Sequence, residues 1–281
     1  MTSYDWFPTF LLFGPPGSGK TRFASHFLRY DLKVEIADIG HGLSSCIKLP
    51  PADRIWNVPS FEKLVAYLAN IEGRDSDVIF IDDVSFLNYK LIMESAQIRL
   101  GAGGSGKDKD QLGRDVRNLI ESGKYNNMNF IPPMLRDRGI ASEKLRIMFY
   151  NLLEIKKILV FTAGEMIYAE KHKESITDDP IVVGPPRRVP KMPGTMPNEI
   201  PHFVSEVFYF YVDAGARDTV YKIRTLPDGG YLHCTKDRSD KMRTLPGWTN
   251  GVIRNDREGK MFDAMIDTLP WPDGKKPVKI A

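Results

Sequence analysis

Six short apolar segments are spaced along the chain, and each predicts a buried β-strand. They cover residues 9–13, 33–38, 54–58, 78–81, 158–163 and 204–212. Helical patterns lie between several of them: Ser60 is a typical N-cap before an apolar stripe over 61–68, and a longer helix is expected over about 86–100. Strands that alternate with helices predict an α/β fold with a mainly parallel sheet flanked by helices on both faces.

The last third of the chain has a different pattern. Residues 219–224 and 230–234 flank the turn sequence Leu226-Pro227-Asp228-Gly229, which predicts an antiparallel C-terminal hairpin that extends the sheet. We expect one core over 1–245, with mobile loops at about 101–113 and 165–200, because the first is rich in glycine and the second in proline. Residues 246–281 are expected to form an irregular tail.

Composition places the chain among ordinary globular proteins. Of its 281 residues, 42% are hydrophobic and 27% charged, and the net charge of +3 is too small to indicate a nucleic-acid partner by itself. Two cysteines form neither a disulfide framework nor a metal-ligand pattern. No apolar run is long enough for a membrane span, and the N-terminus lacks a signal pattern. We expect a cytoplasmic protein without a membrane partner.

The strongest motif follows the first predicted strand. Gly14-Pro15-Pro16-Gly17-Ser18-Gly19-Lys20-Thr21 fits the phosphate-loop pattern G-x-x-x-x-G-K-[ST] without a mismatch, and it precedes a helical segment. Glycines let backbone N–H groups surround a polyphosphate. Lys20 would then reach the β- and γ-phosphates, and the Thr21 hydroxyl would bind Mg²⁺. The motif predicts a site for ATP and Mg²⁺.

Polar residues at the ends of two later strands complete the expected site. The apolar run 78–81 leads into Asp82 and Asp83. In phosphate-loop enzymes an acid at this place holds Mg²⁺, which we assign to Asp82, whereas Asp83 is a candidate base for the attacking water. The simpler interpretation is a solvated aspartate at a strand end. Thr162, at the end of the 158–163 strand, is placed near the γ-phosphate, where it could sense hydrolysis.

Two segments suit a single-stranded nucleic acid, and each has a simpler explanation. The run from Gly101 to Asp110 is either a flexible connector or a loop that orders on a polymer. Between Arg114 and Arg146, seven basic residues are interleaved with Tyr125 and Phe130, as in proteins that bind single strands. Acidic residues dilute this cluster, so a solvated helical face explains it equally well.

Six segments, taken together and in this order, resemble the phage-encoded RecA-like ATPases over about residues 8–245. They are the phosphate loop, the strand ending at Asp82, the strand 158–163, Lys191-Met192-Pro193-Gly194, Pro201-His202-Phe203-Val204 and Lys236-Asp237-Arg238. Some members of that family are single-strand annealing recombinases. The resemblance implies a homo-oligomer, as a ring or a filament, that binds single-stranded DNA at the two loops, with a single-stranded DNA-binding protein as a candidate further partner. It implies that Lys236 and Arg238 enter a neighbour's ATP site, although a solvated strand end explains the pair equally well.

Two positions depart from the family pattern. Relatives often carry a water-activating glutamate after the second strand, where this chain has Ala37-Asp38-Ile39-Gly40, so Asp38 or Asp83 is the expected substitute. Relatives also end the sensor strand in histidine or glutamine, where this chain has Gly164-Glu165. A protein-directed AAA-type ATPase or a nucleotide-gated assembly factor is the alternative function. A small-molecule kinase is disfavoured because Arg187 and Arg188 in a proline-rich loop make a poor lid.

Overall fold

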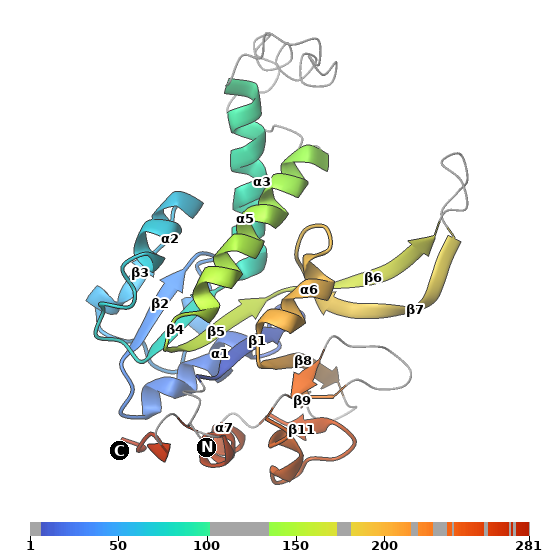
Figure 1. The fold of residues 1–281 in the computed structure, drawn as a ribbon. Helices are drawn as coiled ribbons and strands as arrows, with labels where there is room; N and C mark the ends of the chain where they lie inside the picture. Colours follow the sequence, from blue (N-terminus) through green and yellow to red (C-terminus); the bar gives the residue numbers. More distant parts are fainter. Residues whose placement is uncertain are drawn as a thin grey trace, which may run out of the picture.

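The computed structural model describes residues 7–101, 135–172, 181–214, 219–226, 235–237, 239–255, 258–269, 271 and 274–280. A nine-stranded sheet runs through its centre in the order β11-β9-β8-β1-β5-β4-β2-β3 (Figure 1). Strand β10 pairs with β8 beside this path. Strands β3, β2, β4, β5, β1 and β8 are parallel to one another. Strands β9 and β10 are antiparallel to β8, and β11 is antiparallel to β9. The strand bounds are β1 Thr9–Phe13, β2 Val34–Asp38, β3 Ile55–Asn57, β4 Val78–Asp82, β5 Ile158–Ala163, β8 Glu206–Ala214, β9 Thr219–Arg224, β10 Lys236–Asp237 and β11 Val252–Arg254.

Helices cover both faces of this sheet. One face carries α2 (Phe61–Leu68), α3 (Val84–Gly101), α5 (Leu135–Leu153) and α6 (Met196–Phe203). The opposite face carries α1 (Lys20–Ser25), which continues as a 3₁₀ turn, and α7 (Lys260–Thr268). Alternate residues of each central strand enter the two cores, so that in β1 Leu11 and Phe13 face one core whereas Phe10 and Leu12 face the other.

The predicted parallel α/β fold is confirmed, and so are most of its elements. All six predicted strands are present within one or two residues of the expected bounds. Ser60 caps α2, because its hydroxyl accepts a hydrogen bond from the Lys63 N–H at 3.3 Å. The antiparallel extension of the sheet is formed by β8, β9 and β11. The predicted hairpin partner, residues 230–234, lies outside the described residues, as does the glycine-rich run after Gly101.

The expectation of a loop over 165–200 is wrong. Strands β6 (Glu165–His172) and β7 (Ile181–Pro190) pair as a two-stranded antiparallel ribbon that extends away from the main sheet (Figure 1), and α6 follows it. The ladder is regular from Tyr168 back to Glu165, and its register shifts between Tyr168 and Glu170. Pro185 and Pro186 fall at this irregularity, where the ladder needs no N–H from them.

The expectation of an irregular tail over 246–281 is also wrong. Strand β11 pairs with β9, and α7 packs its apolar side onto α1. Phe262 is 1% exposed and lies edge-on to Phe23 and Phe27, with ring centroids 5.0 and 4.8 Å apart. The segment is therefore part of the second core, although its spacing of prolines and glycines is typical of irregular structure.

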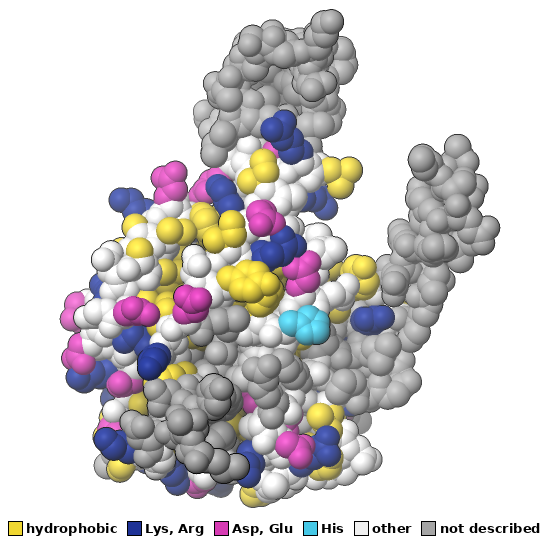
Figure 2. Space-filling view, in the orientation of Figure 1, with side chains coloured by type: hydrophobic (Ala, Val, Ile, Leu, Met, Phe, Trp, Pro, Cys, Tyr) yellow, Lys and Arg dark blue, Asp and Glu magenta, His cyan; other side chains and the backbone are white. Residues whose placement is uncertain are grey.

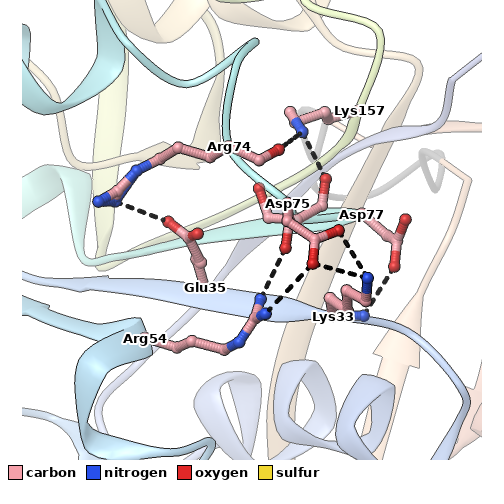
Figure 3. Close-up of polar contacts among 8 residues, drawn as sticks. Lys33, Glu35, Arg54, Arg74, Asp75, Asp77 and Lys157 are labelled. Atoms are coloured by element: carbon pink, nitrogen blue, oxygen red, sulfur yellow. Dashed lines mark hydrogen bonds and ion pairs between the residues drawn. The ribbon is translucent and has the colours of Figure 1, made fainter.

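A polar network holds the edge of the sheet where the parallel strands begin (Figure 3). Lys33 pairs with Asp75 at 2.6 Å, and Arg74 pairs with the buried Glu35 at 3.3 Å. The Lys157 ammonium donates to the Arg74 carbonyl at 2.9 Å, and the Lys33 N–H donates to Asp77 at 2.8 Å. This network lies at the opposite end of the strands from the phosphate loop, so it fixes the sheet without entering the candidate site. Among the described helices, none is long and apolar enough to span a membrane.

Candidate nucleotide-binding site

The phosphate loop joins β1 to α1 and has the backbone that its glycines permit. Gly17 and Gly19 adopt positive φ angles of 74° and 94°. At Gly14 a Cβ would lie 2.0 Å from the Phe210 carbonyl oxygen, so any other residue would collide with β8. The Lys20 ammonium donates to the carbonyls of Gly14 and Pro15, each at 2.9 Å. The lysine is therefore held inside the curve of the loop.

Three polar side chains form a row across the ends of β2, β4 and β5. Asp38 is the register partner of Asp82, and the pairing of β4 with β5 brings Thr162 to the other side of Asp82. All three lie on the face of the sheet that α1 covers, and all are buried. The Thr162 hydroxyl donates a short hydrogen bond to Asp82. The sequence placed Asp82 and Thr162 at strand ends, and the fold brings them into contact.

Thr21 reaches this row from the first turn of α1. Its hydroxyl donates to the two carboxylate oxygens of Asp82 at 3.3 and 3.2 Å. Burial raises the pKa of Asp82 to about 6, and the hydrogen bonds from Thr162 and Thr21 oppose that rise. Gly42 lies against the same carboxylate, since a Cβ there would be 2.7 Å from Oδ2. Thr162, Thr21 and Gly42 thus surround the carboxylate.

This donor set fits Mg²⁺. The ion prefers oxygen ligands and keeps several waters, so it is held by one or two protein oxygens together with substrate phosphates. Thr21 and Asp82 provide such a pair, and the described residues contain no cluster of three or more His, Cys, Asp or Glu that could enclose a metal. When bound, Mg²⁺ would neutralise charge on the β- and γ-phosphates.

The two candidates for water activation differ in how they are bonded. Asp83 Oδ1 accepts the Phe86 N–H at 2.6 Å and so caps α3, and burial raises its pKa. Asp38 is 6% exposed, and its Oδ1 accepts no hydrogen bond from the described residues. Its Oδ2 lies 3.8 Å from His41 Nδ1. Asp38 therefore has a buried carboxylate oxygen that no donor among the described residues engages.

A cavity of about 440 Å³ opens beside the phosphate loop. The loop after β2 contributes Ser44, Ser45 and Cys46 to its wall. The C-terminal part of the sheet contributes Tyr221 from β9 and Asn255, which follows β11. A Cβ on Gly19 would lie 3.5 Å from the Asn255 amide nitrogen and 3.7 Å from the Tyr221 ring. No local sequence pattern marks Tyr221 and Asn255, because the β9–β11 pairing is what brings them to the loop.

Glu165 lies at the junction between this site and the β6–β7 ribbon. Its carboxylate accepts hydrogen bonds from Arg188 of β7 at 3.0 and 3.1 Å. The Arg188 guanidinium also lies over the ring of Tyr209, at 5.9 Å from the centroid. Burial lowers the pKa of Lys20, and the negative charges of Asp83, Asp82 and Glu165 oppose that change. Glu165 is therefore close enough to act electrostatically on the phosphate-loop lysine.

The Lys-x-Arg pair is placed only in part. Lys236 begins β10 and pairs with Val207, which is level with Leu11 of β1, two residues before the end of that strand. The Lys236 side chain and Arg238 lie outside the described residues. Their insertion into a neighbouring site stays a prediction.

Comparison with known proteins gives partial relatives. No protein-family model matches the chain. The Holliday junction branch migration complex subunit RuvB of Staphylococcus saprophyticus is 29% identical over 163 residues, and that of Campylobacter hominis is 28% identical over 165 residues. The alignments cover 54% and 56% of this chain but only 42% of each relative, so the chain spans less than half the length of the curated relatives it matches. The KaiC-like protein PH0186 of Pyrococcus horikoshii superposes over 89% of both chains with 12% identity and a TM-score of 0.40.

The topology and the site agree on the fold. Strand β5, which carries Thr162, lies between β1, which leads into the phosphate loop with Lys20, and β4, which ends at Asp82. The three strands therefore end at the same edge of the sheet. The chain has a P-loop NTPase fold. In this P-loop fold the ATP-binding and Mg²⁺-binding roles of Lys20, Thr21 and Asp82 remain predictions that the geometry supports.

Proposed function

We propose that this chain binds ATP with Mg²⁺ at the phosphate loop and hydrolyses it. The observation that carries the proposal is the contact of Thr21 and Thr162 with the same buried carboxylate, Asp82, beside a loop that holds Lys20. Lys20 would bind the β- and γ-phosphates, and Thr21 and Asp82 would hold the metal ion. Asp38, whose buried Oδ1 is unoccupied by described donors, would take the proton of the attacking water.

We further propose that the protein works as a homo-oligomer, a ring or a filament, on single-stranded DNA in phage-type recombination or replication in the host cytoplasm. The RuvB relatives are named for Holliday junction branch migration, a DNA process. The β6–β7 ribbon begins directly after β5 (Figure 1), so a polymer bound to the ribbon would act on the strand whose Thr162 contacts Asp82. The resemblance of Lys236-Asp237-Arg238 to a finger pair supports a site shared between subunits.

Surface charge decides which control the DNA experiment needs. On the face shown in Figure 2, Lys and Arg side chains are interspersed with Asp and Glu, and apolar side chains lie among them. Exposed apolar residues of α5 include Ile147 (52%) and Tyr150 (56%). Such a mixed surface binds DNA only where a local basic segment reaches it. A protein-directed ATPase is therefore the outcome to test against.

Binding to a fluorescent single-stranded oligonucleotide, measured with and without ATP across a salt series, tests the DNA partner. We expect binding that strengthens with ATP and weakens as salt rises, because Lys and Arg contacts to phosphates release counterions. Arg187→Ala with Arg188→Ala on the ribbon should weaken it, whereas Lys279→Ala, at the far end of the molecule, should not. Absence of binding, or ATPase stimulation by a protein partner and not by DNA, would favour the protein-directed alternative.

Mixing two inactive variants tests the shared site. Lys20→Ala lacks the phosphate-binding lysine, and Arg238→Ala lacks the proposed finger. If the finger acts in trans, mixed oligomers contain some intact sites, and phosphate release returns partly. If each subunit completes its own site, the mixture remains as inactive as the separate variants.

A further inference from the structure

Glu206 is a buried acid that the nucleotide site does not use. It is the first residue of β8, is 0% exposed, and lies in the sheet between Phe10 of β1 and Asp237 of β10. Its Oε1 accepts the Ser239 N–H at 3.0 Å. Its Oε2 is also buried, and no donor among the described residues reaches it. A fully buried carboxylate oxygen without a donor is costly.

The neighbouring carboxyl group of Asp237 is already engaged. Its Oδ1 accepts the Ser239 hydroxyl at 2.8 Å, and its Oδ2 accepts the Met242 N–H at 3.1 Å. The two acids thus share Ser239 and are register partners in the sheet, with Glu206 buried and Asp237 half-buried. If both were ionised, the two negative charges would repel each other.

Among the described residues, no cation is found to pair with Glu206 or Asp237. From β1 the neighbour is Phe10, and the 3₁₀ turn after β10 contributes the apolar Met242. In that turn, the exposed Asp240 and Arg243 pair with each other at 2.8 Å. The Lys236 side chain and Arg238 lie outside the described residues. Burial first, and the charge of Asp237 second, raise the pKa of Glu206 to about 8.

We propose that Glu206 and Asp237 share one proton, and that the resulting hydrogen bond is a clasp that holds β10 against β8. With the proton on Glu206, Oε2–H donates to the Asp237 carboxylate and gains the partner that it otherwise lacks. Strand β10 has only two residues and two register pairs with β8, and among the described residues the Ser239 N–H bond to Glu206 is a further contact that holds it there. Loss of the proton leaves two repelling carboxylates at the point where β10 is held.

The clasp has a functional consequence, which rests on the proposed function. Asp237 stands between Lys236 and Arg238, the pair proposed to enter a neighbouring ATP site. Glu206 is then a positioning residue that acts through β10 without touching nucleotide. We expect ATP turnover to fall at alkaline pH as the clasp opens, and the Glu206→Gln variant to resist that fall because its amide donates to Asp237 at every pH.

The direction of the stability change follows from proton linkage. Glu206 ordinarily titrates near pH 4.5, and in the folded protein it keeps its proton until about pH 8. A raised folded-state pKa contributes stability that is complete below the unfolded pKa and is lost as pH rises through the folded value. The wild-type urea midpoint should therefore fall between about pH 5 and pH 8 relative to that of Glu206→Gln. The Asp240→Asn variant, which changes an exposed acid nearby, should keep the wild-type dependence.

The experiment combines urea unfolding from pH 5 to 9 with infrared spectroscopy of the folded protein. At pH 7 the wild type should show the carbonyl band of a protonated carboxyl group. The part of this band that Glu206→Gln lacks should disappear from the wild type above pH 9. If Glu206→Gln does not fold, the shared proton can still be tested by the presence of the wild-type band and by a change of its frequency in Asp237→Asn. No band at pH 7, or equal pH dependence of the two midpoints, overturns the clasp. If the band is present but wild type and Glu206→Gln have the same ATPase pH profile, the clasp is confirmed and only its effect on the neighbouring ATP site is contradicted. If the wild type has no ATPase activity, only the proposed function is contradicted.

Discussion

Replacing Phe262 by alanine tests whether the end of the chain belongs to the core. The ring is 1% exposed and packs edge-on against Phe23 and Phe27 of the segment that follows the phosphate loop. Truncating a buried phenylalanine typically costs about 3–5 kcal/mol, and aromatic pairs contribute about 0.5–1.5 kcal/mol each beyond area burial. The ring lies between two elements that are fixed to the sheet, so the site cannot collapse easily, and we expect a loss of about 4 kcal/mol.

Urea unfolding followed by circular dichroism measures this loss. The matched control is Asp267→Ala on the same helix, which removes an exposed ion pair with Lys276 and should cost less than about 1 kcal/mol. Because α7 also borders His26 of the nucleotide cavity, the Phe262 variant should bind ATP more weakly at equal folded fraction. A loss below about 1 kcal/mol for Phe262→Ala would refute the packing of α7 on α1.

Three further changes test the site itself. Thr162→Val keeps the side-chain volume but removes the hydrogen bond to Asp82, which is worth about 1.5–3 kcal/mol for a charged acceptor, so kcat should fall about 10–100-fold with a small change in KM. Gly14→Ala should abolish ATP binding and destabilise the protein by about 1–3 kcal/mol or more, because its Cβ would lie 2.0 Å from the Phe210 carbonyl oxygen. The control is Gly17→Ala, whose Cβ meets no atom within 4 Å; it should cost only about 1 kcal/mol, from the positive φ angle. Asn255→Ala should weaken nucleotide binding by roughly tenfold, the worth of one hydrogen bond, and leave kcat at saturating ATP unchanged, as titration calorimetry and steady-state kinetics would show.

Local patterns were enough to predict the centre of the fold. The phosphate loop is a contiguous motif, and the strands that end at Asp82 and Ala163 begin with four apolar residues each because they are buried on both faces. Parallel strands end at one edge of the sheet, so the sequence could also indicate that Lys20, Asp82 and Thr162 lie near one another. It could not give the strand order, and therefore not the direct contact of Thr162 with Asp82.

The remainder depends on long-range pairing. Tyr221 and Asn255 reach the cavity through the β9–β11 ladder, in which Arg254 pairs with Lys222, and no short segment encodes that pairing. The β6–β7 ribbon was missed because its prolines argue against a strand, whereas they lie at an irregular part of a two-stranded ladder. The tail was missed because Trp271-Pro272-Asp273-Gly274 suggests a turn, while the helix that precedes it buries Met261, Phe262, Met265 and Ile266.

The central claim is that Lys20 and the row at Asp82 bind and hydrolyse ATP. The most direct measurement compares wild type and Lys20→Ala for ATP binding by titration calorimetry and for phosphate release, both with Mg²⁺ present. We expect the wild type to bind and turn over ATP, and the variant to unfold at the same urea concentration while losing binding or turnover. Normal hydrolysis by Lys20→Ala would contradict the assignment of the site.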